Sequence, residues 1–344
     1  MKKRIIILGA MITSVTIALI PIINASVENM TPSIVKVKSG LIIADGLNNE
    51  NQTKEQLMTN QQYWHYTGSA VVRNALFDLY GDTQGLHIGV KAPSNGTYAG
   101  FFAVNPETKA MLFHSVISSG IRAISDSDNY FQNGLYVQTS NGSINYVSCV
   151  SVTNHVKTVW SVVSAEGDTG GARQFHVLWT NSSLNQPLTR ECTVITNGQN
   201  YLKVYMDNVL VYSNNTLDLP MPDPFLTFLE VQSSYNGKPL YGTYRDFYIT
   251  SNENIDVISN PSTATTVKLV DLTGAVLASG DVVDGTARLN VGKYHFPLTA
   301  NIVVYNSTNV PIVSTSSPVK IFGGDVFSAR QNWSIENFVS FLNL

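Results

Sequence analysis

Alternation of apolar and polar residues with a period of two is the main pattern along this chain. From Tyr63 onward, short apolar runs follow one another about every eight to twelve residues, separated by clusters of Gly, Ser, Thr and Asn, as in antiparallel sandwiches. The pattern predicts about a dozen strands. They are expected at 69–74, 85–91, 98–104, 109–118, 133–140, 144–153, 158–165, 173–181, 188–196, 225–232 and 244–250, with a hairpin over 201–212.

The clearest local signal is the segment 201–212, Tyr-Leu-Lys-Val-Tyr-Met-Asp-Asn-Val-Leu-Val-Tyr. Side chains alternate on both sides of Asp207-Asn208, so the segment is expected to form two strands around a tight turn. The segment 242–250, Gly-Thr-Tyr-Arg-Asp-Phe-Tyr-Ile-Thr, predicts a short aromatic strand that closes the same region.

The parts on either side of this region predict a further division of the chain. Residues 26–62 hold one apolar strand at 38–44 and a polar stretch with a loop or short helix at 53–59, and we expect them to pack on the sandwich. The polar segment 251–265, with its Asn260-Pro261 break, predicts a linker. A second, small sandwich of about six strands is expected at 266–327, where Gly323-Gly324-Asp325 would end it. A C-terminal segment follows at 328–344, with a helix expected at 334–342.

Composition agrees with an all-β fold. Only 13% of the residues are charged and 44% are hydrophobic, and this balance, with frequent Gly, Ser, Thr and Asn, favours strands and turns over helices. The net charge of −3 is spread evenly, and no Lys/Arg cluster follows the N-terminus. Nucleic acid is therefore not expected as a partner.

The N-terminus predicts export. Lys2-Lys3-Arg4 precedes an uncharged stretch at 5–23, and Ile23-Asn24-Ala25 fits a signal-peptide cleavage site, so residues 1–25 would be removed. The alternative is an uncleaved anchor, because nineteen residues of helix span roughly 28 Å. Either way, the rest of the chain is expected outside the cytoplasm, and the membrane is a partner only through this segment.

Two further features agree with export. Cys149 and Cys192 are the only cysteines, and both lie in strand-like runs, so we expect a disulfide between them; the alternative is two buried thiols. The chain also holds many Asn-x-Ser/Thr sequons, which predict a glycosylated surface protein. The better placed ones are at Asn51, Asn95, Asn141, Asn181, Asn214, Asn306 and Asn332.

The hairpin at 201–212 and the strand at 242–250 resemble the last strands of concanavalin A-like (laminin-G-like) jelly-roll modules, a likeness that extends over roughly 63–250. The resemblance implies a jelly-roll sandwich that handles glycans. The segment 266–327 resembles the small immunoglobulin-like or carboxypeptidase-regulatory-like sandwiches. The expected fold class is thus all-β, a concanavalin-type jelly-roll sandwich plus a small Ig-like β-sandwich.

An enzyme of this fold would show a catalytic pattern. Jelly-roll hydrolases of the laminarinase type carry Glu-x-Asp-x-x-Glu on one strand, because alternation points the carboxylates into the cleft. The nearest match is 166–171, Glu-Gly-Asp-Thr-Gly-Gly, which lacks the last Glu. The chain is therefore not expected to be a hydrolase of this type.

Four polar residues could instead form a floor that binds sugar. Tyr136 and Gln138 share one face of their strand, and Gln174 and His176 share one face of theirs. If the two faces converge on one side of a sheet, they offer stacking and hydrogen bonds to a glycan. A polysaccharide lyase could use a Tyr or His of this floor as its base. The alternative is an ordinary face turned to solvent.

Metal binding has one candidate. Asp126 and Asp128, beside Asn129, offer several oxygen ligands, which suits calcium, although a solvated loop explains the same residues.

We expect an exported cell-surface protein that binds glycans or mediates adhesion, with other surface proteins as further partners. The alternatives are a carbohydrate-active enzyme with a divergent site and a structural component of the envelope.

Overall fold

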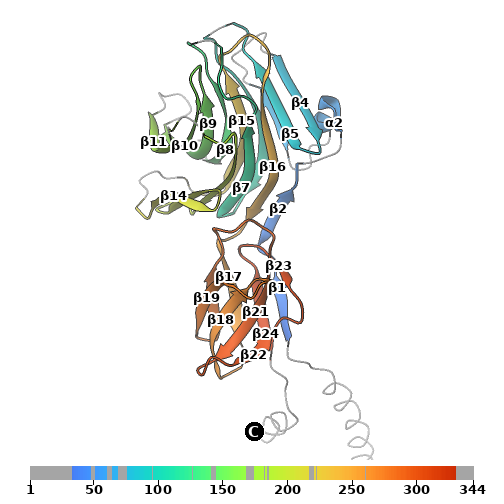
Figure 1. The fold of residues 1–344 in the computed structure, drawn as a ribbon, viewed down its shortest axis with the longest axis vertical. Helices are drawn as coiled ribbons and strands as arrows, with labels where there is room; N and C mark the ends of the chain where they lie inside the picture. The colour runs from blue at the N-terminus through green and yellow to red at the C-terminus, as the bar shows by residue number, and fades with distance from the viewer. Residues whose placement is uncertain are drawn as a thin grey trace, which may run out of the picture.

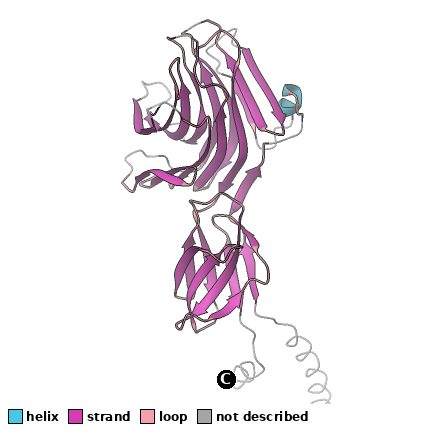
Figure 2. Ribbon diagram, viewed as in Figure 1, coloured by secondary structure: helices cyan, strands magenta, loops and turns pink. Residues whose placement is uncertain are grey.

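The structure, a computed structural model, describes residues 33–330 apart from 48–50, 60–63, 69–75, 95, 126, 141–144, 168–173, 182, 184–185, 217–220, 222 and 260. The described chain forms a large β body stacked end to end on a smaller one (Figure 1). Strands joined by loops build both bodies, and the described residues contain one short helix (Figure 2). The expected signal segment 1–25, the strand at 69–74 and the helix at 334–342 lie wholly or almost wholly outside the described residues.

The large body consists of two antiparallel sheets packed face to face. Its seven-stranded sheet has the order β11-β10-β9-β8-β15-β6-β3, and its eight-stranded sheet has the order β14-β13-β12-β7-β16-β5-β4, with β2 also paired to β16. The first sheet contains β11 (Gln174–Asn181), β10 (Thr158–Glu166), β9 (Tyr146–Thr153), β8 (Phe131–Thr139), β15 (Phe225–Ser233), β6 (Ala99–Thr108) and β3 (His65–Gly68). The second contains β14 (Val209–Asn214), β13 (Leu202–Met206), β12 (Thr189–Thr196), β7 (Leu112–Ser119), β16 (Leu240–Thr250), β5 (Gly85–Lys91), β4 (Leu76–Asp82) and β2 (Leu41–Asp45).

This architecture is a jelly-roll sandwich of the concanavalin type, which confirms the expected fold class for the large body. The core lies between the sheets, where Phe113 of β7 meets Phe225 of β15 edge to face at 5.5 Å between ring centroids. Trp160 is fully buried in the same cluster. Alternation explains the two faces of each strand: in β8, Leu135 and Val137 belong to this core, and the residues between them point out of the sandwich.

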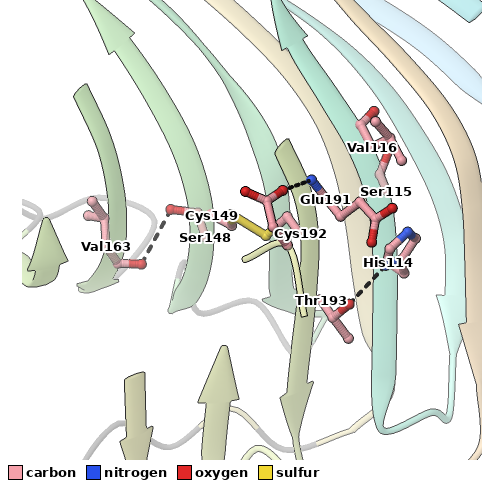
Figure 3. Close-up of a disulfide and its surroundings, with 10 residues drawn as sticks. His114, Ser115, Val116, Ser148, Cys149, Val163, Glu191, Cys192 and Thr193 are labelled. Atoms are coloured by element: carbon pink, nitrogen blue, oxygen red, sulfur yellow. Dashed lines mark hydrogen bonds between the residues drawn. A yellow bond between two sulfur atoms is a disulfide. The ribbon is translucent and has the colours of Figure 1, made fainter. Parts of the chain in front are cut away.

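A disulfide joins the two sheets, as expected from the sequence. Cys149 of β9 is bonded to Cys192 of β12, with 6.4 Å between their Cα atoms, and the bond crosses the core between the sheets (Figure 3). It closes a loop with a sequence separation of 43 residues.

The expected hairpin is confirmed as β13 and β14. Asp207 and Asn208 have φ values of 51° and 64°, the left-handed conformation that a two-residue turn of this kind needs at both positions. The Asp207 carboxylate accepts hydrogen bonds from the Arg190 side chain and the Glu191 amide. The segment 242–250 lies in the same sheet as part of β16, but β12 and β7 separate it from the hairpin.

Other elements differ in extent from those expected. The short helix is α2 (Lys54–Thr59), which buries Leu57 against the large body. The sequence pattern missed β3 and β4, because each is an outer strand without a long apolar run. The expected strand at 38–44 corresponds to β2, but it begins only at Leu41: the chain bends at Ser39-Gly40 between β1 (Ser33–Lys38) and β2, and these two strands belong to different bodies.

The small body is a nine-stranded sheet of order β1-β24-β17-β20-β19-β18-β21-β22, with β23 paired to β21. The sheet folds over on itself at β19, whose first part pairs with β18 and whose end pairs with β20. Its strands after β1 are β17 (Asn254–Ser259), β18 (Ala264–Val270), β19 (Val276–Val283), β20 (Thr286–Asn290), β21 (Leu298–Asn306), β22 (Pro311–Ser314), β23 (Val319–Ile321) and β24 (Val326–Arg330).

Two expectations about this region require correction. The segment 251–265, expected to be a linker, contains β17, which pairs with β20 and, in parallel, with β24. The turn at 323–325 does not end the small body, because β24 follows it and pairs with β1. Both strands are short and take their partners from distant parts of the chain, so neither shows in local sequence.

The two bodies meet in a packed junction. Leu112, Ile195 and Tyr248 of the large body belong to the same apolar cluster as Phe296 and the other core residues of the small body. The Tyr248 hydroxyl accepts a hydrogen bond of 3.2 Å from the Phe296 amide. Within the described residues, no helix has the length and hydropathy needed to cross a membrane.

Candidate functional site

The outer face of the seven-stranded sheet carries a groove with a volume of about 900 Å³. Every strand of that sheet contributes to its lining, and Tyr98 and Tyr130, just before β6 and β8, also border it. Because strands lie about 4.8 Å apart, residues paired across the sheet form rows over the groove floor.

One row contains the only carboxylic acid among the described lining residues. Glu230 of β15 is paired with Phe102 of β6 on one side and with Gly134 of β8 on the other. Gly134 is in turn paired with Val150 of β9. A Cβ atom at Gly134 would lie 2.5 Å from Cγ1 of Val150, so the floor is open beside the carboxylate only because this residue is glycine.

The next row is aromatic at its centre. It runs from Phe228 of β15 to Tyr136 of β8, Ser148 of β9 and Val163 of β10. Tyr136 is 3% exposed and packs edge to face against Tyr146, with 5.3 Å between the ring centroids. Burial, with a further contribution from Glu230, raises the pKa of Tyr136 well above its usual value.

Hydrogen bonds fix the polar side chains of the groove. The Gln132 amide nitrogen donates to the Tyr136 hydroxyl. The Gln232 amide nitrogen donates to the Glu230 carboxylate, which is 6% exposed. These bonds hold the side chains in one arrangement before any ligand arrives, which lowers the conformational entropy that binding must overcome.

The groove is polar on one side and apolar on the other. Around β15 and β8 it presents the amides of Gln132, Gln138 and Gln232 and the carboxylate of Glu230. Around β9, β10 and β11 it presents mainly apolar side chains, which are Val150, Val152, Val163, Phe175 and Val177.

The structure brings together two of the four residues expected to bind sugar. Tyr136 and Gln138 line the groove, whereas Phe175 and Val177, not Gln174 and His176, represent β11 there. His176 is paired with Ser164 and lies 3.5 Å from the Glu166 carboxylate. Gln174 and His176 therefore do not line the groove with Tyr136 and Gln138, and a role of either in sugar binding stays a prediction.

The sequence pattern could not show which face of β11 is turned toward the groove. It is an edge strand, and Phe175 and Val177 remain 61% and 66% exposed, so either face of its alternating pattern could have been turned to the groove. Sequence reasoning also missed Glu230, Gln232 and Gln132. The signal that could have revealed the first two is the pair of large polar side chains at alternate positions, 230 and 232, in a mainly apolar strand.

The calcium prediction gains no support from the structure. Asp126 lies outside the described residues, and Asp128 is exposed. Among the described residues, no group of three or more His, Cys, Asp or Glu could hold a metal ion.

The sequons stay predictions, but several of them have a local structural role. Asn95, Asn141 and Asn332 lie outside the described residues, and Asn51 is exposed at a turn. In three others, the Asn side-chain oxygen accepts hydrogen bonds from the residue two positions later; these are Asn181, Asn214 and Asn306. Side-chain turns of this kind favour the Asn-x-Ser/Thr pattern without any glycan.

No protein-family model matches the chain, and no curated protein is similar to it in sequence. Among solved structures it is similar to LamAcat from Zobellia galactanivorans, with 11% identity, a TM-score of 0.43, and 61% of this chain and 97% of that one covered. It is similar to a glycoside hydrolase family 16 endo-glucanase from Bacteroides ovatus, with 8% identity, a TM-score of 0.40 and coverage of 60% and 98%. A third is the carbohydrate-binding module CBM66 from Bacillus subtilis, with 7% identity, a TM-score of 0.33 and coverage of 55% and 98%. These similarities are too distant to indicate a ligand or an activity for this chain. The functional argument therefore rests on the groove itself.

Proposed function

We propose that the groove binds a carbohydrate chain. The observation that carries the proposal is the combination, on one floor, of aromatic rings with amides and a carboxylate held by hydrogen bonds. Sugar rings have apolar faces that stack on aromatic side chains and hydroxyl edges that pair with amides and carboxylates.

The residues of the groove suit binding of a carbohydrate better than its enzymatic cleavage. Retaining glycoside hydrolysis needs two carboxyl groups about 5 to 5.5 Å apart, and Glu230 is the single carboxylic acid among the described lining residues. A lyase would need a base that loses its proton near neutral pH. Burial raises the pKa of Tyr136, which makes it a poorer base of that kind.

The proposal places this binding at the cell surface. The N-terminal pattern of a basic cluster followed by an uncharged stretch supports export, and the disulfide between Cys149 and Cys192 suits an oxidising compartment. In this proposal, the small body is a spacer that holds the groove away from the point of attachment.

Carbohydrate arrays and calorimetry with the purified chain test the proposal. Phe175→Ala removes a ring that lines the groove and is mostly exposed, so the fold should be unaffected. The loss of one stacking contact, about 0.5–1.5 kcal/mol, should weaken binding about two- to twelvefold.

A matched control is Leu272→Ala, which removes a 70% exposed apolar side chain from the small body and should leave affinity unchanged. Equal affinity of the Phe175 variant and the wild type, or no sugar bound by the wild type, would contradict the proposal.

A further inference from the structure

Four valines form an aliphatic surface within the groove. Val150 and Val152 of β9, Val163 of β10 and Val177 of β11 all line it, and together they are named the valine surface. The first three belong to, or pack against, an apolar cluster that is separate from the core between the sheets. The face of an antiparallel sheet that is turned away from the core is usually polar. An apolar patch on such a face commonly marks a binding site.

The valine surface begins directly beside the polar part of the groove. Gln132 of β8 is paired with Val152 of β9, so an amide and an aliphatic side chain lie on neighbouring strands, about 5 Å apart. From β9 the surface continues to Val163 and Val177, which are paired with each other on β10 and β11. Three strands span about 10 Å. The polar part and the valine surface thus form one continuous floor.

A sugar alone does not suit the valine surface. Sugar hydroxyl groups placed against valine side chains would lose hydrogen bonds to water and gain none in return, which costs free energy. Two serines lie among the valines, but Ser148 donates its hydroxyl proton to the Val163 carbonyl and Ser161 donates to the Thr180 hydroxyl. Both serines are buried. The groove therefore has one part that suits hydroxyl groups and another that suits hydrocarbon.

We propose that the groove binds a glycan with an alkyl chain at one end, as in a glycolipid, with the sugar beside the amides and the chain on the valine surface. This inference rests on the proposed function. The groove volume of about 900 Å³ is in the range of small-molecule sites. An alkyl chain that crosses β9, β10 and β11 would cover all four valines, whereas an acetyl group would cover only part of them.

Alkyl glycosides test the proposal by calorimetry with the purified full chain. The probes are methyl and hexyl β-maltoside, β-cellobioside and β-lactoside, in which each pair shares its sugar and differs by five methylene groups. In the pair whose sugar binds best, the hexyl glycoside should bind at least about tenfold more tightly than the methyl glycoside. Burial of two of the five methylene groups is enough for a gain of about that size.

The double variant Val163→Thr/Val177→Thr locates this gain. It keeps the branched shape of both side chains and replaces one methyl group in each by a hydroxyl group. Val177 is 66% exposed and Val163 is partly exposed, so the fold should be unaffected. The gain from the hexyl chain should fall to about threefold or less, while the affinity for the methyl glycosides should stay unchanged.

Two further variants keep the test decisive. The matched control is Val276→Thr/Val283→Thr, which changes two exposed valines of β19 in the small body and should keep the full gain. If the double variant in the groove fails to fold, Val177→Thr alone, on the edge strand β11, should still reduce the gain.

The outcomes separate the two proposals. If glycans on an array bind but the hexyl chain adds no affinity, or adds affinity that the groove variants leave intact, this inference is overturned and the proposed function stands. If 1-hexanol binds as tightly as the hexyl glycosides, the sugar contributes nothing and both proposals fail. They also fail together if the wild type binds neither an array glycan nor an alkyl glycoside.

Discussion

Tyr136 is the residue whose chemistry in the groove is most closely defined. Its ring packs on Tyr146, its hydroxyl accepts a hydrogen bond from Gln132, and only 3% of its surface is exposed. Tyr136→Phe keeps the ring and removes the hydroxyl. If that hydroxyl also bonds to a sugar, the loss of one net hydrogen bond, about 0.5–1.5 kcal/mol, weakens binding about two- to twelvefold.

Calorimetry with a neutral oligosaccharide measures this effect, and Tyr305→Phe in the small body is the control. Unchanged affinity would show that the hydroxyl serves only the fold.

For single residues, the sequence could predict which side chains share one face of a strand. It could not predict which residues of neighbouring strands lie next to one another across the sheet. Tyr136 and Gln138 were found because alternation places them on one face of β8. Glu230 was not, because its neighbours Gly134 and Phe102 come from strands far away in the chain. Gln174 and His176 were assigned to the groove by polarity, yet the register of β11 turns Phe175 and Val177 toward it.

The strands β9 and β12 are joined covalently across the two sheets by the disulfide between Cys149 and Cys192. On the chain-entropy model, a loop of this length stabilises the fold by about 4 kcal/mol. The double variant Cys149→Ser/Cys192→Ser should lose about that much free energy of unfolding, measured by urea titration.

Because the bond lies in the core and not in the groove, the folded variant should still bind glycan. An unchanged unfolding midpoint would contradict this account.

Elements with regular alternation could be predicted from sequence, and elements defined by distant partners could not. Most strands from β5 to β15 fall within a few residues of their expected positions, because one face of each packs on the core. The strand β17 looked like a polar linker, since its partners β20 and β24 follow about 30 and 70 residues later. The expected strand at 38–44 begins three residues later, at Leu41, because the chain bends at Gly40, which packs against Gly323 and Gly324 where a Cβ atom would meet backbone atoms.

In the molecule as a whole, the junction between the bodies contains a fully buried histidine. The ring of His114, in β7, stacks on Tyr248 and contacts the ring of His295 edge to face. Its Nδ1 atom is hydrogen-bonded to the Thr193 hydroxyl (Figure 3). The Glu191 carboxylate faces His295. Burial, helped by His295, lowers the pKa of His114 well below its usual value. On unfolding, His114 regains its ordinary pKa and binds a proton that the folded state does not.

The contribution of neutral His114 to the free energy of unfolding is therefore fully present above about pH 6.5. It decreases as the pH falls below that value. The melting temperature of the wild type should decrease between pH 7.5 and 5, and that of His114→Gln should decrease less. His155→Gln, at an exposed turn, serves as the control. Equal decreases in all three proteins would exclude His114 as the source.

The pairing of Ser33 with Arg330 places the first and last described residues side by side on β1 and β24. The chain passes between the bodies twice, before β2 and after β16. Force applied between a ligand in the groove and Ser33 would therefore run along β1 and pass straight into β2 of the large body, so it would load β1 along its length. Pulling the two ends apart would instead open that strand pair one hydrogen bond at a time. The same protein should thus resist tension from its ligand far better than tension across its own termini.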